Sequence, residues 1–274
     1  MPIDLIDIGA NLTHDSFDDD REEVLRRAND AGVRRMILTG SSVADSKEAV
    51  ELAASMPGIF YATAGIHPHH ASDYSDDVHE TLSQLTAHDA VVAVGECGLD
   101  YFRNFSPQDD QREAFRRQLE LAAESQLPVF LHQRDAHDDF LKILAPVMKD
   151  MSRGVAHCFT GGADELHAYL DLGLYIGITG WVCDERRGEN LKNIIDQIPL
   201  DRLMIETDAP YLLPRTISPK PKARRNEPMY LREVLRVVAG QRDMPEAELA
   251  RATTANAERF FSLQVPTSES SRLP

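Results

Sequence analysis

Residues 91–101, VVAVGECGLDY, begin as a continuous apolar run, which is typical of a strand that is buried on both faces in a parallel sheet. The run breaks at Gly95, and the next residue is a carboxylate, Glu96. In parallel α/β proteins, the loops that leave the carboxyl ends of the strands form the active-site face. We therefore expect Glu96 at a strand end on that face, as a buried structural acid, a general base or a metal ligand.

Apolar runs alternate with amphipathic segments along the rest of the chain. The eight strand–helix units fit the length that an eightfold barrel needs, so the sequence predicts an α/β fold, a (β/α)8 TIM barrel. The predicted strands are 5–8, 35–38, 60–64, 91–94, 128–131, 154–156, 174–178 and 203–205, and the predicted helices are 18–31, 43–56, 75–86, 108–125, 136–149, 163–172, 189–197 and 228–240.

Two segments depart from this alternation. Residues 214–228 are rich in proline and basic side chains, which predicts a loop rather than a helix. After Phe261 the sequence SLQVPTSESSRLP has the composition of a disordered end. Because no linker divides the body, we expect a single barrel domain, residues 1–263, followed by a disordered tail, residues 264–274.

The overall charge limits the kind of partner that the chain can have. A formal net charge of -16 argues against a protein held on DNA by a broad basic surface, although an enzyme could still act on nucleic acid through bound cations and a local basic loop. The start of the chain lacks the basic and apolar regions of a secretory signal, and no apolar run approaches the roughly 18 residues of a membrane span. The spacing of Cys97, Cys158 and Cys183 is typical of reduced thiols in a cytoplasmic protein.

Polar residues follow most of the predicted strands. His67 comes after the third strand, Glu96 after the fourth, His132 after the fifth, His157 after the sixth and Asp208 after the eighth. At the top of a barrel these side chains would converge, and imidazoles with carboxylates suit Mn²⁺, Zn²⁺ or partly hydrated Mg²⁺. One such histidine alone could be a hydrogen-bonded structural residue, but three polar endings directly after apolar runs favour a metal site.

The histidines of the segment GIHPHH, residues 65–70, have two interpretations. The segment could be a turn with surface histidines, or His67 could act on the substrate. His69 and His70 are expected to be exposed.

Six segments in order resemble the TatD family of metal-dependent deoxyribonucleases, which belongs with the amidohydrolase-type TIM barrels. The resemblance covers residues 3–263 and implies a divalent-metal site and hydrolysis of phosphodiester bonds in DNA. By position, Glu96, His132 and His157 match metal ligands, and Asp208 matches the aspartate that binds metal and activates water. The matching segments are GIHPH (65–69), GECGLDY (95–101), LHQRDA (131–136), HCFTG (157–161), ETDAPYL (206–212) and RNEP (225–228).

The first strand departs from the family pattern. Most members carry Asp-x-His-x-His there, and its histidines help to hold a second metal ion, whereas here Gly9 and Asn11 follow Asp7 in the corresponding positions. Whether the site holds one metal ion or two therefore stays open. The variant GANLT resembles a branch of the family described as 3′→5′ exonucleases on single-stranded DNA and RNA, with a role in DNA repair, and the resemblance implies that activity here.

These observations predict roles for the remaining site residues. A cation held by Glu96, His132 and His157, most simply Mg²⁺, would polarise the phosphate, and Asp208 would act as general base. His67 is expected to steady the phosphate or to protonate the leaving group. Single-stranded DNA or RNA would be the partner of a monomeric enzyme. Phosphate contacts are expected from the basic run 215–225, with Arg215 and Arg225, and Asn226 would orient this loop, whereas Tyr101, Phe102, Trp181 and Tyr211 are candidates for base stacking.

Two alternatives remain open at this point. An amidohydrolase or lactonase on the same barrel would direct the activated water at a carbonyl group, although the basic run favours a phosphate substrate. The second alternative is a barrel that binds nucleic acid but does not hydrolyse it, because it has lost the metal ligands of the first strand. It would be unaffected by Glu96→Ala and Asp208→Ala, which should both inactivate a nuclease.

Overall fold

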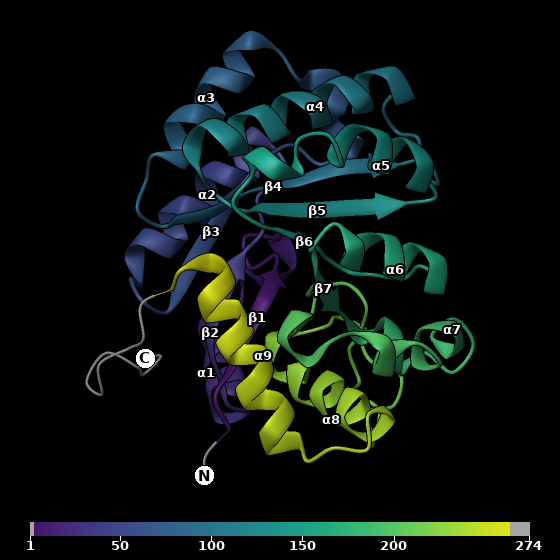
Figure 1. The fold of residues 1–274 in the computed structure, drawn as a ribbon. Coiled ribbons are helices and arrows are strands. Elements are labelled where there is room, and N and C mark those ends of the chain that lie inside the picture. The colour runs from purple at the N-terminus through teal and green to yellow at the C-terminus, as the bar shows by residue number, and fades with distance from the viewer. Residues whose placement is uncertain (1–2, 264–274) are drawn as a thin grey trace.

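Eight parallel strands form one sheet in which each strand pairs with its neighbour in sequence (Figure 1). The structure is a computed structural model that describes residues 3–263. The strands are β1 (Leu5–Ala10), β2 (Val33–Leu38), β3 (Phe60–Ala64), β4 (Val91–Asp100), β5 (Val129–Arg134), β6 (Gly154–Ala156), β7 (Tyr175–Ile178) and β8 (Leu203–Ile205). Just beyond β8, Asp208 N donates to Gly9 O and Asn11 N donates to Ala209 O, both at 2.8 Å. These bonds join the two edges, and the predicted TIM barrel is confirmed.

Helices follow the strands and cover the outside of the barrel (Figure 1). The predicted helix 136–149 ends at Leu144, two residues before Pro146, which has no N–H to continue the helical hydrogen bonds. The predicted helix 189–197 is a four-residue helix followed by a separate 3₁₀ turn at Ile195–Gln197. The helices are α1 (Arg21–Asp30), α2 (Val43–Ser55), α3 (Asp76–Thr86), α4 (Gln108–Ser125), α5 (His137–Leu144), α6 (Ala163–Asp171), α7 (Glu189–Lys192), α8 (Leu231–Gln241) and α9 (Glu246–Phe261).

Strand β4 is longer than the sequence predicts. It continues through Gly95 to Asp100, so Glu96 lies within the strand and not after it. The pairing with β5 shifts in register between Val94 and Cys97, which marks an irregularity in the ladder at this point. Such irregularities re-aim side chains, and here the carboxylate that follows Gly95 points to the active-site end of the barrel.

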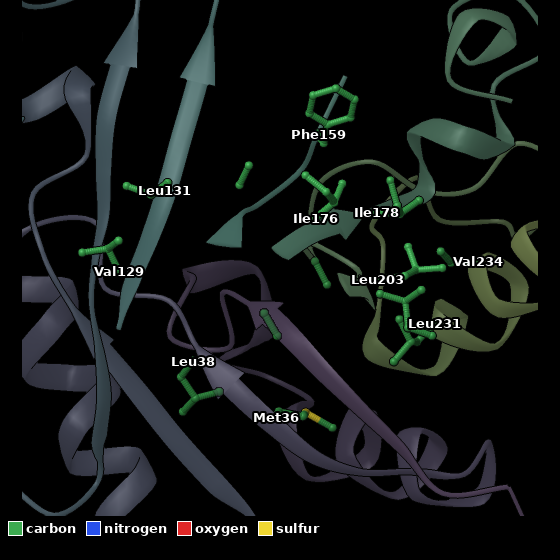
Figure 2. Close-up of a cluster of buried hydrophobic side chains, with 14 of the residues drawn as sticks. Met36, Leu38, Val129, Leu131, Phe159, Ile176, Ile178, Leu203, Leu231 and Val234 are labelled. Carbon is green, nitrogen blue, oxygen red and sulfur yellow. The ribbon is translucent and has the colours of Figure 1, made fainter. Parts of the chain in front are cut away.

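The largest core layer lies between the sheet and the surrounding helices. Figure 2 shows part of it, with Ile176 of β7 and Leu203 of β8 in the same cluster as Leu231 and Val234 of α8. These side chains are all fully buried. At about 1.5–3 kcal/mol for each buried side chain, this layer is the main force that fixes the helices to the barrel.

A second apolar cluster fills the inside of the barrel. Ile8, Phe130 and Met204 come from three different strands, and Phe260 and Phe261 of α9 join them. Helix α9 also bonds to the start of β8, since Asn256 Nδ2 donates to Leu203 O at 2.7 Å. This helix is not among the helices predicted from the sequence; it covers the amino ends of the strands and leaves the carboxyl ends open.

The loop predicted for residues 214–228 contains no α-helix, and a 3₁₀ turn, Pro228–Tyr230, follows it. Within residues 3–263, none of the helices combines the length and the apolar character that a membrane crossing would require. The predicted tail, residues 264–274, lies outside the described residues.

Candidate metal and active site

A cavity of about 550 Å³ opens at the carboxyl ends of the strands. Five of the residues singled out from the sequence line it together, and each comes from a different strand or the loop that follows it. They are His67, Glu96, His132, His157 and Asp208. The convergence that the sequence predicts is therefore present in the fold.

Glu96 is the centre of the cluster. Its Oε1 lies 2.8 Å from His132 Nδ1, 2.7 Å from His157 Nε2 and 3.4 Å from His67 Nε2. Burial alone would raise the pKa of Glu96, but the surrounding imidazoles outweigh it and hold that pKa well below its usual range. Three ring nitrogens therefore converge on one carboxylate oxygen.

A second carboxylate stands behind each of the two histidines that contact Glu96 most closely. His157 Nδ1 faces Glu206 Oε2 at 3.4 Å, and His132 Nε2 lies 3.5 Å from Asp100 Oδ2. Burial opposes protonation of His157, but the charges of Glu96 and Glu206 raise its pKa well above the ordinary value. Metal-bound histidines are commonly oriented by an outer carboxylate in this way. From the sequence, Glu206 is expected at the end of the eighth strand as a polar residue able to bind metal or transfer a proton, whereas no role is predicted for Asp100.

Glu206 is fully buried, and two glycines make room for it. A Cβ at Gly9 would lie 2.5 Å from Glu206 Oε2, and one at Gly177 would lie 2.6 Å from Glu206 Oε1. Cys158 N donates to Glu206 Oε1 at 2.5 Å, which fixes the carboxylate from the other side. The glycine at the first-strand position therefore has a structural reason, because any side chain there would meet this carboxylate.

His67 belongs to the only group of three potential ligands that lie within 4.8 Å of one another in residues 3–263, together with Glu96 and His132. Its Nδ1 accepts a hydrogen bond from His69 N at 3.0 Å. Burial is the main cause that lowers the pKa of His67 to about 3, so the ring is neutral and carries its proton on Nε2. In this tautomer His67 offers a hydrogen-bond donor to the cavity rather than a lone pair.

The prediction that His69 is exposed is wrong, because its ring is 28% exposed and its Nε2 bonds to Asp100 Oδ2 at 3.0 Å. His70 is exposed, as predicted. Asp100 therefore contacts two histidines, His69 and His132. Part of the segment GIHPHH, residues 65–70, thus belongs to the site and is not a surface turn.

Asp208 lies at the opposite wall of the cavity from β4. Asn11 Nδ2 donates to Asp208 Oδ1 at 3.2 Å, so the first-strand amide orients the last-strand carboxylate. Burial is the main cause that raises the pKa of Asp208 to about 7. Asp7 is fully buried and is occupied by Thr207, whose Oγ1 donates to Asp7 Oδ2 at 2.5 Å and whose N donates to Asp7 Oδ1 at 2.9 Å.

The donor set fits a divalent cation. Glu96, Asp100, Glu206 and Asp208 surround the imidazoles, so neutral rings leave an excess of negative charge in a site shielded from solvent. His132 and His157 each turn one ring nitrogen toward Glu96 and the other toward an outer carboxylate, which is the arrangement of metal-binding imidazoles. Imidazole and carboxylate ligands of this kind suit Mg²⁺, Mn²⁺ and Zn²⁺.

The three residues that the sequence predicts for substrate contacts or loop orientation after β8 each have a partner within the protein. Arg225 is only 22% exposed and binds Asp20 at 2.7 Å and Glu227 at 3.0 Å, so it ties the loop to the start of α1. Arg215 pairs with Asp184 at 3.2 Å. Asn226 is fully buried, and its Nδ2 donates to Thr207 O at 2.9 Å. Asn226 thus holds the loop against the end of β8, whereas a substrate contact for any of these residues stays a prediction.

Two arginines that the sequence analysis did not select line the cavity itself. Arg103 lies in the loop after β4, and Arg134 is the last residue of β5. Arg103 follows the strand that carries Glu96 and Arg134 ends the strand that carries His132, and these positions are the signal that the sequence offers.

Comparisons with known proteins agree with this geometry. The family model described as TatD related DNase matches residues 6–262. The chain is 51% identical over 259 residues to the 3′-5′ ssDNA/RNA exonuclease TatD of Erwinia billingiae (strain Eb661), covering 94% of this chain and 99% of that protein.

Solved structures show the same fold. The TatD homologue YJJV from Escherichia coli K12 superposes with a TM-score of 0.86 at 30% identity, covering 97% of this chain and 100% of that one. The hydrolase TatD family protein from Entamoeba histolytica superposes with a TM-score of 0.85 at 29% identity, covering 95% and 98% of the two chains.

Proposed function

The chain belongs to the TatD related DNase family, and we propose that it is a divalent-metal-dependent 3′→5′ exonuclease that hydrolyses phosphodiester bonds in single-stranded DNA and RNA. The support from sequence is 51% identity, over nearly the whole length of both chains, with a protein named for that activity. The observation that carries the proposal is the contact of Glu96 Oε1 with His132 and His157, each backed by an outer carboxylate. We include in the proposal a role in DNA repair or degradation.

Glu96, His132, His157 and Asp208 would hold the metal, which we propose is Mg²⁺, with Mn²⁺ and Zn²⁺ as alternatives. A divalent cation bound there supplies Lewis-acid polarisation of the phosphoryl group and lowers the pKa of bound water. The support is the donor set described above, in which three ring nitrogens and two carboxylates face one cavity.

Asp208 is our candidate for the general base. Asn11 binds its Oδ1 and leaves Oδ2 for the proton of the attacking water. His67 would donate from Nε2 to a phosphoryl oxygen or to the leaving oxygen, since its Nδ1 is occupied by His69 N. These two residues and Glu96 are the groups whose removal should stop hydrolysis.

The first strand offers little to a second ion. Gly9 has no side chain, Asp7 is occupied by Thr207, and Asn11 is engaged with Asp208. We therefore propose that the enzyme holds one metal ion tightly. We also propose that it is a monomeric, cytoplasmic enzyme formed by a single domain, residues 1–263. The free state of Cys97, Cys158 and Cys183 is consistent with a reducing compartment.

The test uses a single-stranded oligonucleotide labelled at its 5′ end, incubated with the protein and Mg²⁺. We expect a ladder that shortens from the 3′ end, its loss with EDTA, and its loss in Glu96→Ala and Asp208→Ala. A phosphorothioate linkage at the 3′ end should slow the first cleavage. No cleavage by the wild type, with hydrolysis of a cyclic amide or a lactone instead, would contradict the proposal.

A further inference from the structure

Exposed aromatic side chains mark one part of the cavity rim. Among residues 3–263, the large hydrophobic side chains that are exposed are Phe102 at 54%, Phe105 at 67% and Tyr211 at 52%. Phe102 and Phe105 lie in the same short loop between β4 and α4, next to the cavity. Two exposed rings in one loop keep a large apolar area in water, which points to a binding surface.

Cationic side chains accompany these rings. The Arg134 guanidinium lies 3.8 Å from the centre of the Phe102 ring, and that of Arg103 lies 5.7 Å from it. Both arginines line the cavity, and in the described part of the chain neither guanidinium lies within 4.0 Å of a carboxylate oxygen, unlike those of Arg215 and Arg225. In a protein with 45 acidic residues against 29 lysines and arginines, this is a selective placement of positive charge.

The loop is held in place by the metal cluster itself. Asp100 Oδ1 accepts hydrogen bonds from Phe102 N at 3.0 Å and Arg103 N at 2.8 Å, while Oδ2 binds His69 Nε2 at 3.0 Å. The His69 ring contacts Phe105, with 4.6 Å between the ring centres. One buried carboxylate therefore fixes the exposed rings relative to His132, which it also faces. Side chains fixed in this way bind a ligand at a lower entropic cost.

We propose that Phe102, Phe105, Arg103 and Arg134, which we call the aromatic shelf, bind the nucleotide on the 5′ side of the scissile phosphodiester. The rings stack on its unpaired base, and the arginines hold the phosphates next to it. This inference rests on the proposed exonuclease function. In that reaction the 3′-terminal nucleotide enters the cavity, and the rest of the strand must leave across the rim, where the shelf lies. Stacking and cationic contacts of this kind accept any base, as an exonuclease requires.

A double-mutant cycle between protein and substrate tests the stacking. The wild type and Phe102→Ala are compared on a normal single strand and on strands with one abasic site at the first, second or third position from the 3′ end. We expect Phe102→Ala to lower kcat/KM on the normal strand by about 5- to 150-fold. It should have little further effect on the strand that is abasic at the second position from the 3′ end, the nucleotide that the shelf binds, and Phe102→Trp should restore activity on the normal strand. Equal losses on every strand, no loss, or a loss that disappears at the first or third position instead would overturn the proposal.

Salt dependence tests the arginines. Arg103→Gln and Arg134→Gln should each reduce the slope of log(kcat/KM) against log[salt] by about 0.7 for every phosphate that the arginine neutralises in the wild type. The matched control is Arg251→Gln, because Arg251 is exposed on α9 at the other end of the barrel, and its slope should stay that of the wild type. Slopes that are unchanged in both shelf variants, or reduced equally in the control, would contradict the assignment.

Failure of this inference is distinguishable from failure of the proposed function. If the wild type does not shorten any strand, the exonuclease proposal fails. If the wild type shortens the strands and the shelf variants do so equally well, only the shelf is refuted.

Discussion

Replacement of the buried carboxylate Glu206 by glutamine tests how the fold prepares its metal ligands. Glu206 faces His157 Nδ1 at 3.4 Å and accepts from Cys158 N at 2.5 Å. In Glu206→Gln, the amide oxygen can keep the Cys158 bond, which places the amide NH₂ against His157 Nδ1. The ring must then carry its proton on Nε2, the nitrogen that faces Glu96 and would bind the metal.

Loss of an outer partner of this kind costs about 10- to 100-fold in metal affinity, or about 1.4–2.7 kcal/mol. We expect a loss of that size when Mn²⁺ is titrated into the variant by calorimetry, with a similar shift in the Mn²⁺ concentration needed for half-maximal hydrolysis. The matched control is Glu227→Gln, another buried carboxylate that pairs with Arg27 at 2.8 Å and lies in the loop after β8. It should lose stability but keep its Mn²⁺ affinity. Wild-type Mn²⁺ affinity in a folded Glu206→Gln protein would refute the reasoning.

Three further substitutions test other parts of the structure. Gly9→Ala places a Cβ 2.5 Å from Glu206 Oε2, so Mn²⁺ affinity should fall as in Glu206→Gln, and an unchanged calorimetric titration would contradict this. Phe260→Ala opens a cavity in the fully buried plug of the barrel and should lower the free energy of unfolding in urea by about 3–5 kcal/mol, whereas a loss below about 1 kcal/mol would show that α9 is not a true part of the core. Arg225→Gln breaks the pairs with Asp20 and Glu227 and should lower the free energy of unfolding by about 1–3 kcal/mol, with KM for single-stranded DNA unchanged. Unchanged stability with a raised KM would favour a direct substrate contact.

Most of the barrel could be predicted from the sequence because its strands are short apolar runs buried on both faces. The bounds 60–64, 154–156 and 203–205 are those of β3, β6 and β8. The end of β4 could not be predicted, because Gly95 usually interrupts a strand and here marks only a shift in register. Helix α9 was missed although Leu249, Ala257 and Phe260 recur on one helical face, since a ninth helix has no place in a strict alternation of strands and helices.

The candidate site was predictable only in its inner residues. Glu96, His132 and His157 follow apolar runs, which is a local signal that one sequence carries. Glu206 directly follows the apolar run 203–205 and Asp100 lies between Leu99 and Tyr101, but their roles depend on which ring nitrogen they face in three dimensions. The basic run around Arg225 does not reveal its pairing with Asp20, because Asp20 is distant in sequence and close only in the fold.

The most direct test of the central claim is anomalous scattering from a crystal soaked in Mn²⁺. We expect a strong peak at coordination distance from Glu96, His132, His157 and Asp208, with the outer nitrogens of the two histidines still facing Asp100 and Glu206. A crystal with no peak beside Glu96, or with its main peak bound by other residues, would contradict it.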